Sequence, residues 1–215
     1  MGNKSLPDFL DILHEELSAF IALIDRTALE EARDLIFEAE RNHGRVHVTG
    51  IGKPGHVAGY TASLLSSTGT PTYELHGTEA VHGSSGQVVP GDVVIAISNS
   101  GETEELKGTV ETLRSNGARI IAVTGNKSSW LAQQADVVLF AGVDYEGDPL
   151  NKPPRASIAA EIIVLQSLSV LLQEERDLTP EKYVKWHPGG ALGKSIRDVS
   201  DVSDVSGKGE NHLEG

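Results

Sequence analysis

The sequence predicts an α/β fold in which a doubly wound, parallel, five-stranded sheet is flanked by helices and preceded by N-terminal helices. Short apolar runs alternate along the chain with longer segments of helical periodicity, an order that is typical of parallel sheets. The run at 93–97 is continuously apolar, as in a strand that is buried on both faces. The chain has 215 residues, which corresponds to about one domain.

The elements follow one another in a regular order. Two helices are expected between residues 5 and 42, where apolar residues such as Leu10, Leu13 and Leu17 recur at helical spacing. The strands are predicted at 46–49, 70–75, 92–98, 120–124 and 137–141. Helices are predicted at 54–67, 103–116, 128–134 and 156–175, and a glycine-rich connection at 76–86. The polar segment 198–215 is expected to be disordered.

Composition narrows the classes of function. The formal net charge is −13, so nucleic acid and anionic membranes are not expected as partners. There is no cysteine, which excludes disulfides and cysteine-based metal sites. No apolar stretch approaches the ~20 residues of a transmembrane helix, and the N-terminus lacks the pattern of a signal peptide. We therefore expect a cytoplasmic protein.

A cluster of hydroxyl residues follows the third predicted strand. Ser98, Asn99, Ser100 and Thr103 lie within six residues around a glycine, just before a predicted helix. Hydroxyls and free backbone N–H groups at a helix N-terminus suit an anion such as phosphate. The simpler interpretation is that Ser100 or Thr103 only caps the helix.

A second glycine turn, at residues 50–56, follows the first predicted strand and carries Gly52 and Lys53. In open α/β sheets, ligands bind beyond the carboxyl ends of the strands, where the strand order reverses. If these two strands are neighbours, Lys53 and the hydroxyl cluster face one pocket. Lys53 then orients a substrate oxygen; otherwise it is a surface lysine.

Three other side chains are candidates for chemistry. Glu105 lies one turn into the helix after the hydroxyls, and its neighbours Glu102 and Glu104 suit the helix dipole. Glu146 follows the last strand and, by chemistry alone, is typical of a solvated loop acid. His187 precedes a proline and two glycines, and it can either exchange protons with a substrate or cap a helix that begins at the proline.

The pair His76 and His82 does not have the spacing of a standard zinc site. We expect these two side chains to make hydrogen bonds rather than to hold a metal, although incidental binding of a divalent metal stays open.

Taken in order, five motifs carry a resemblance to a known family. They stand at residues 50–56, 66–71, 79–83, 98–103 and 187–193. Together they resemble the sugar isomerase (SIS) domain of bacterial D-arabinose 5-phosphate isomerases over about residues 30–197. We therefore expect one SIS domain over residues 1–197, including the N-terminal helices.

The resemblance implies a reaction and a set of residues. The family interconverts D-arabinose 5-phosphate and D-ribulose 5-phosphate without a cofactor, and no metal is expected. Proteins of this kind form dimers and tetramers with sites at subunit interfaces, so a homotetramer is expected. The implied catalytic residues are Lys53, Glu105, Glu146 and His187, and the implied substrate- and phosphate-binding residues are Gly52, Ser98, Asn99, Ser100, Thr103 and His82. Glu146 matches a Glu-x-x-Pro-Leu pattern of the family, so the resemblance favours a catalytic role for it over that of a solvated loop acid.

Two departures from the family pattern leave alternatives open. Family members usually continue into a pair of CBS domains, and a form without that pair is expected here. Arg155 and Ala156 stand where the family has hydroxyl residues, which leaves the identity of the substrate open. The alternatives are an isomerase of another phosphosugar, such as a 3-hexulose 6-phosphate, or a non-catalytic sensor of sugar phosphates. A nucleotide-binding module is disfavoured, because Lys53 and Pro54 occupy the centre of the glycine turn.

Overall fold

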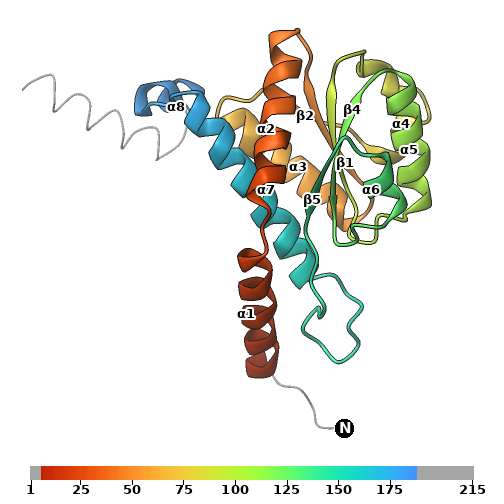
Figure 1. Ribbon diagram of the computed structural model, residues 1–215, viewed down its shortest axis with the longest axis vertical. Helices are drawn as coiled ribbons and strands as arrows, with labels where there is room; N and C mark the ends of the chain where they lie inside the picture. Colours follow the sequence, from red (N-terminus) through yellow and green to blue (C-terminus); the bar gives the residue numbers. More distant parts are fainter. Residues whose placement is uncertain (1–5, 188–215) are drawn as a thin grey trace, which may run out of the picture.

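The computed structural model describes residues 6–187 and contains one five-stranded sheet between two layers of helices (Figure 1). The strands are β1 (Val46–Gly50), β2 (Thr72–Glu74), β3 (Val93–Ile97), β4 (Arg119–Thr124) and β5 (Val137–Phe140). They are parallel and lie in the order β2-β1-β3-β4-β5. The predicted doubly wound parallel sheet is confirmed.

Helices divide between the two faces of the sheet. One face is covered by α2 (Arg26–Arg41), α3 (Lys53–Ser67) and α7 (Ala156–Glu175), with α1 (Leu6–Ala22) packed against α7. The other face carries α4 (Gly77–Ala80), the 3-10 helix η1 (Ser84–Gln87), α5 (Glu104–Ser115) and α6 (Trp130–Gln134). The final described helix is α8 (Pro180–Trp186).

Each central strand contributes side chains to two hydrophobic cores. Val93 and Ile95 of β3 pack with α2, α3 and α7, whereas Val94 and Ala96 pack with α4 and α5. All five residues of β3 are buried, because successive side chains of a strand point to opposite faces and both faces are covered. The prediction that residues 93–97 form a strand buried on both faces is confirmed.

Local capping sets several helix boundaries. The Asp25 carboxylate accepts the N–H of Thr27 at 3.0 Å at the start of α2, and Pro54 lies in the first turn of α3. The sequence expectations missed α8, although Thr179 followed by Pro180 is a cap signal. The helix expected to begin just after His187 and the tail at 198–215 lie outside the described residues.

One expectation about the chain was wrong. Helix α7 is long and apolar enough, by length and composition, to cross a membrane, although no such stretch was expected. Half of its apolar window is buried inside the fold, where it packs on α2 and α3. A helix that is apolar on most sides is typical of the core of an α/β fold as well as of a membrane span.

The strand order creates a crevice between β1 and β3. From β1 the chain proceeds to β2 on one side, and from β3 it proceeds to β4 and β5 on the other side. The last pair in the register between these strands is Gly50 with Ile97, so the turns that follow both strands emerge side by side. This is the switch point at which open α/β sheets bind ligands.

Candidate active site

The turn after β1 presents Lys53 at one side of the crevice. Gly52 precedes α3 with a φ of 67°, a conformation that favours glycine. Lys53 is the first residue of α3, and its side chain is exposed. Its ammonium group has no hydrogen-bond or ion-pair partner within residues 6–187, so it is available to a ligand.

The turn after β3 holds its hydroxyl groups in fixed positions. The Ser98 Oγ accepts the N–H of Gly101 at 3.1 Å and lies 3.2 Å from the Thr103 Oγ1. The Ser100 Oγ accepts the N–H of Glu102 at 3.2 Å. The carbonyl of Asn99 accepts the N–H of Gly125 at 2.9 Å, which ties the turn to the end of β4. The hydroxyls are therefore oriented before any ligand arrives.

The backbone amides at the start of α5 distinguish a turn that binds an anion from one whose hydroxyl groups only cap the helix. Thr103 occupies the cap position, yet its side chain makes no capping hydrogen bond. The first N–H groups of a helix have no partner within the helix. They are thus left for an anion, which favours the phosphate interpretation over simple capping.

Gly101 makes the close packing of this turn feasible. Its φ is 67°, and a Cβ atom placed there would stand 2.5 Å from the Cβ of Ser129. No other residue type fits both the conformation and the space.

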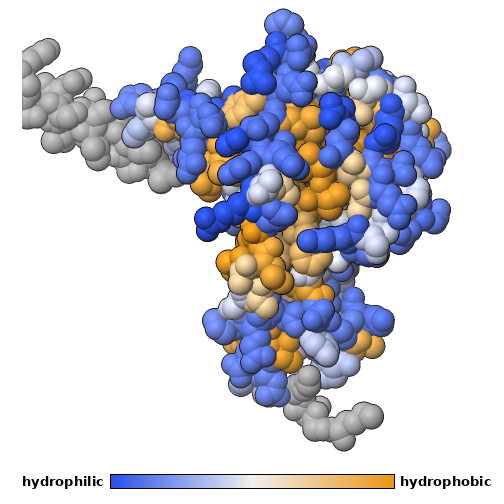
Figure 2. Space-filling model, viewed as in Figure 1, coloured by the Kyte–Doolittle hydropathy of each residue, from blue (hydrophilic) through white to orange (hydrophobic). Residues whose placement is uncertain are grey.

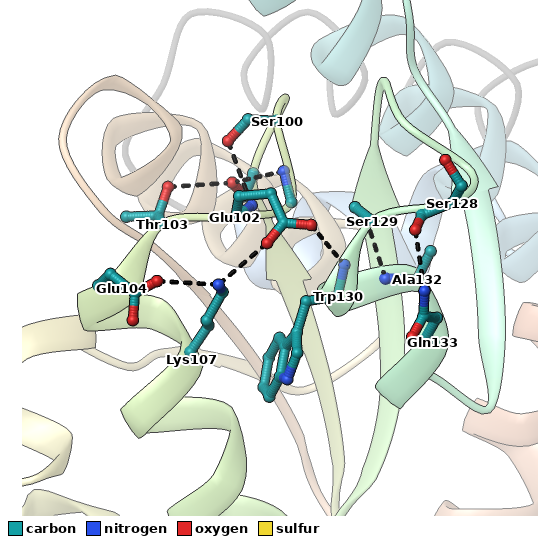
Figure 3. Close-up of polar contacts among 12 residues, drawn as sticks. Ser100, Glu102, Thr103, Glu104, Lys107, Ser128, Ser129, Trp130, Ala132 and Gln133 are labelled. Carbon is teal, nitrogen blue, oxygen red and sulfur yellow. Dashed lines mark hydrogen bonds and ion pairs between the residues drawn. The ribbon is translucent and has the colours of Figure 1, made fainter.

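The three glutamates near the start of α5 differ in their partners, and Figure 3 shows two of them, Glu102 and Glu104, beside Lys107. The Glu102 carboxylate accepts the N–H of Trp130 at 2.7 Å and pairs with Lys107 at 2.9 Å, and both contacts lower its pKa. Glu104 also pairs with Lys107 at 2.9 Å. Glu105 is exposed and its carboxylate has no partner within the described residues. The sequence did not say which glutamate is free, and the structure selects Glu105.

Glu146 is buried, so its interpretation as a solvated loop acid was wrong. Its Oε2 atom accepts the N–H of Arg155 at 2.6 Å and that of Ser157 at 3.1 Å, at the start of α7. Its own N–H donates to Asn151 at 2.6 Å. The Oε1 atom makes no hydrogen bond within residues 6–187. One oxygen is thus fixed and the other is free, an arrangement that suits a positioned base.

A hollow connects Lys53 with the start of α7. It measures about 300 Å³ and is lined by residues that include Lys53, His56, Pro154 and Ile158. Pro154 stands next to Arg155, whose N–H binds Glu146. Lys53 and the segment that holds Glu146 therefore border the same space, at the carboxyl edge of the sheet.

Arg155, which departs from the family pattern, is occupied within its own loop. Its guanidinium pairs with the Asp148 carboxylate. The pKa of Asp148 is lowered: burial acts in the opposite direction, but the N–H groups of Leu150 and Asn151 and the Arg155 guanidinium outweigh it. This arginine stabilises the loop around Glu146.

The two histidines near α4 have different surroundings. His76 Nδ1 lies 3.1 Å from the Thr78 hydroxyl, and His82 is exposed. Within residues 6–187 no group of three or more His, Asp or Glu side chains is arranged to hold a metal ion. A smaller hollow of about 160 Å³, lined by Gly50, Gly52 and His76 among others, lies beside the turn after β1.

His187 does not join the other candidates within one chain. Its Nδ1 lies 2.8 Å from the carbonyl of Tyr183, and its ring stacks on the Tyr183 ring at 3.9 Å. The adjacent Trp186 packs on Gly69, just beyond the C-terminal end of α3. Lys53 begins that 15-residue helix, so the two ends are about 22 Å apart. The structure places the turn that carries Lys53 beside the hydroxyl turn, and it places His187 near the opposite end of α3.

Glu161 is a further residue that the sequence expectations missed. It lies one turn beyond Ser157 on α7 and is completely buried, and neither carboxyl oxygen has a hydrogen-bond partner within residues 6–187. Burial, with a smaller contribution from the charge of Glu146, raises its pKa to about 8. The sequence signal that could have identified Glu161 is an acidic residue within the apolar residues of a predicted core helix.

Comparison with known proteins identifies relatives. The SIS domain family model matches residues 19–170. The arabinose 5-phosphate isomerase KdsD of Pseudomonas aeruginosa is 42% identical over 167 residues, which are 78% of this chain and 51% of that protein. KdsD of Escherichia coli K12 is 40% identical over 167 residues, which are 78% and 50% of the two proteins. The chain thus spans about half the length of the curated relatives that it matches.

Solved structures give a match over the full length of a shorter protein. The c3406 protein of E. coli CFT073, solved in complex with arabinose 5-phosphate, is 36% identical. The match covers 87% of this chain and 100% of that one, with a TM-score of 0.75.

Proposed function

Because this chain belongs to the SIS domain family, we propose that it is a cofactor-independent aldose–ketose isomerase of a phosphosugar. The proposed reaction converts D-arabinose 5-phosphate to D-ribulose 5-phosphate and back. The names of the KdsD relatives and the arabinose 5-phosphate complex of the c3406 protein support this substrate. The observation that carries the proposal is that the turns with Lys53 and the hydroxyl groups emerge side by side at the switch point of the sheet.

The chemistry needs few groups. A proton moves between C1 and C2 through a cis-enediol, so a base must take a carbon-bound proton, and acid–base groups must serve the two oxygens. Negative charge that develops on the enediolate must be stabilised in a site that excludes water. Carboxylates, a lysine and a histidine meet these needs without a metal.

The phosphate binds at the start of α5. The hydroxyls of Ser98, Ser100 and Thr103 and the free amides of α5 hold it, with Gly52, Asn99 and His82 around the rest of the sugar. A protein with a net charge of −13 attracts no anion through its overall field. Helix dipoles and backbone amides provide the local positive potential instead.

Proton transfer falls to Glu146 or Glu105. Glu146 has one oxygen fixed by two N–H groups and one oxygen free, which favours it as the base. Glu105, unpaired on the first turn of α5, then serves a substrate oxygen. Lys53 stabilises charge on the substrate oxygens, and His187 assists ring opening or protonates an oxygen.

His187 acts in the site of a neighbouring subunit. Its separation from Lys53 along α3 supports this assignment, and it requires an oligomer, which we propose to be a homotetramer with sites at subunit interfaces. Apolar side chains gather on the surface where α1, α2 and α7 meet (Figure 2). Ile21, Leu23 and Val170 are exposed there, as expected of a surface that another copy covers. The proposed location is the cytoplasm.

The reaction is tested with a panel of pentose and hexose 5- and 6-phosphates, followed by ketose formation and by deuterium exchange at C2. Deuterium exchange with arabinose 5-phosphate supports the proposal. Exchange only with a hexose phosphate would contradict this substrate and identify an isomerase of another phosphosugar. Binding of sugar phosphates without any exchange would identify a sensor and contradict the proposal.

The shared site is tested by complementation. Lys53→Ala and His187→Ala are each expected to be inactive. In a mixed oligomer of the two variants, a site that combines the intact Lys53 of one chain with the intact His187 of another recovers activity. Failure of the mixed oligomer to recover any activity, although mass spectrometry shows that it forms, would contradict a shared site.

A further inference from the structure

Helix α7 carries a buried carboxyl group that senses the charge of the proposed base. Glu161 is completely shielded from solvent, and both of its oxygens lack hydrogen-bond partners in the part of the chain that the structure describes. Burying a polar group without a partner is unfavourable, and burying an isolated charge is far more so. A glutamate at such a position is therefore expected to have a role beyond packing.

The neighbouring groups connect Glu161 to Glu146. Ser157 lies one helical turn before Glu161, so the two side chains share a face of α7. The N–H of Ser157 donates to the Glu146 Oε2 at 3.1 Å, and the Ser157 hydroxyl is buried with no partner among residues 6–187. Ser157 thus holds the Glu146 carboxylate through its backbone and shares a helix face with Glu161.

The electrostatic coupling points to the same pair. Burial raises the pKa of Glu161 to about 8, and among residues 6–187 Glu146 is the charged group whose field adds to this shift. Helices α1, α2 and α3 pack near α7, but their charged side chains, such as Glu16, Glu40 and Lys53, do not contribute to it. At neutral pH the Glu161 carboxyl group therefore adds no second negative charge near Glu146.

We propose that Glu161 is a positioning residue for Glu146: a buried, unpartnered carboxyl group, one helical turn from the Ser157 N–H that holds Glu146, which controls the negative charge near Glu146 when the sugar phosphate binds. The inference rests on the proposed function, because its importance lies in the charge of the incoming ligand. A phosphate dianion and a developing enediolate are both repelled by a second carboxylate. Ionisation of Glu161 thus slows the reaction, while Glu161 itself never touches the substrate.

Activity against pH tests the effect on catalysis. In the wild type, kcat/KM for arabinose 5-phosphate is expected to fall through a transition near pH 8, reaching about a tenfold loss at pH 9. Glu161→Gln cannot ionise, so its profile lacks this transition, while its activity at pH 7 stays within about threefold of wild type. Ser169→Ala, at another buried position of α7, is the control and keeps the wild-type profile. A transition near pH 8 that persists in Glu161→Gln would overturn the proposal.

A second measurement needs no substrate. Titration of ¹³C-labelled glutamate side chains by NMR should show one carboxyl with a midpoint near pH 8 in the wild type. In Glu146→Gln the neighbouring charge is gone, so this midpoint should move down by about one pH unit. An unchanged midpoint would refute the coupling, even if Glu161→Gln fails to fold. A lowered midpoint in a protein that isomerises no phosphosugar would instead refute the proposed function and leave the coupling intact.

Discussion

The substitution Glu161→Gln should change how stability depends on pH. Below about pH 4.5 the Glu161 carboxyl is neutral in both the folded and the unfolded chain. As pH rises, the unfolded chain releases this proton near pH 4.5, whereas the folded chain keeps it until about pH 8. The unfolded state therefore gains free energy from ionisation that the folded state does not, and stability is lost progressively between these two pH values.

The magnitude follows from the two pKa values. A pKa raised from 4.5 to about 8 corresponds to roughly 5 kcal/mol, most of it from burial and less from the charge of Glu146. Glutamine has no proton to lose, so the free energy of unfolding of Glu161→Gln lacks this dependence. The difference between wild type and variant should change by roughly 5 kcal/mol from pH 4.5 to pH 8 and stay constant above that.

Equilibrium unfolding in guanidinium chloride between pH 5 and 9, at one fixed protein concentration, measures this difference. Glu174→Gln makes the same chemical change at an exposed position of the same helix and should give a flat difference. The free energy of unfolding of wild type minus that of Glu161→Gln could also change by less than about 1 kcal/mol over this range. That result would show that Glu161 is not a neutral, buried carboxyl group.

Three other predictions concern the proposed site. Glu146→Gln should keep the cap of α7 and its melting temperature but lower kcat by about 10²-fold or more, and wild-type turnover would remove Glu146 from the mechanism. Glu105→Gln should lower kcat by at least about tenfold, whereas Glu104→Gln, which loses only a surface ion pair, should stay within about twofold; equal effects would contradict the assignment. Gly101→Ala should destabilise the fold by roughly 2 kcal/mol and raise KM at least about tenfold, because its Cβ displaces Ser129; unchanged thermal unfolding and KM would show that the turn is not tightly packed.

The departures from expectation share a physical cause. Glu146 was first read as a loop acid because nothing in its own segment reveals that the N–H groups of Arg155 and Ser157 bind its carboxylate. The 70–75 strand shortened to Thr72–Glu74 because only part of that run pairs with β1. Strand pairing and burial depend on partners that lie elsewhere in the chain, so local patterns predict them incompletely.

The order of strands and helices, the glycine turns and the hydroxyl turn after β3 were readable from the chain, because periodicity and turn chemistry are properties of neighbouring residues. Only the tertiary structure decided that β1 lies beside β3, which brings Lys53 to the hydroxyl turn. It also buried Glu161 within reach of the charge of Glu146 and set His187 near the far end of α3. Side chains from distant segments meet only when the sheet and the helix layers pack, and that packing determines their solvent exposure, their hydrogen bonds and their charge.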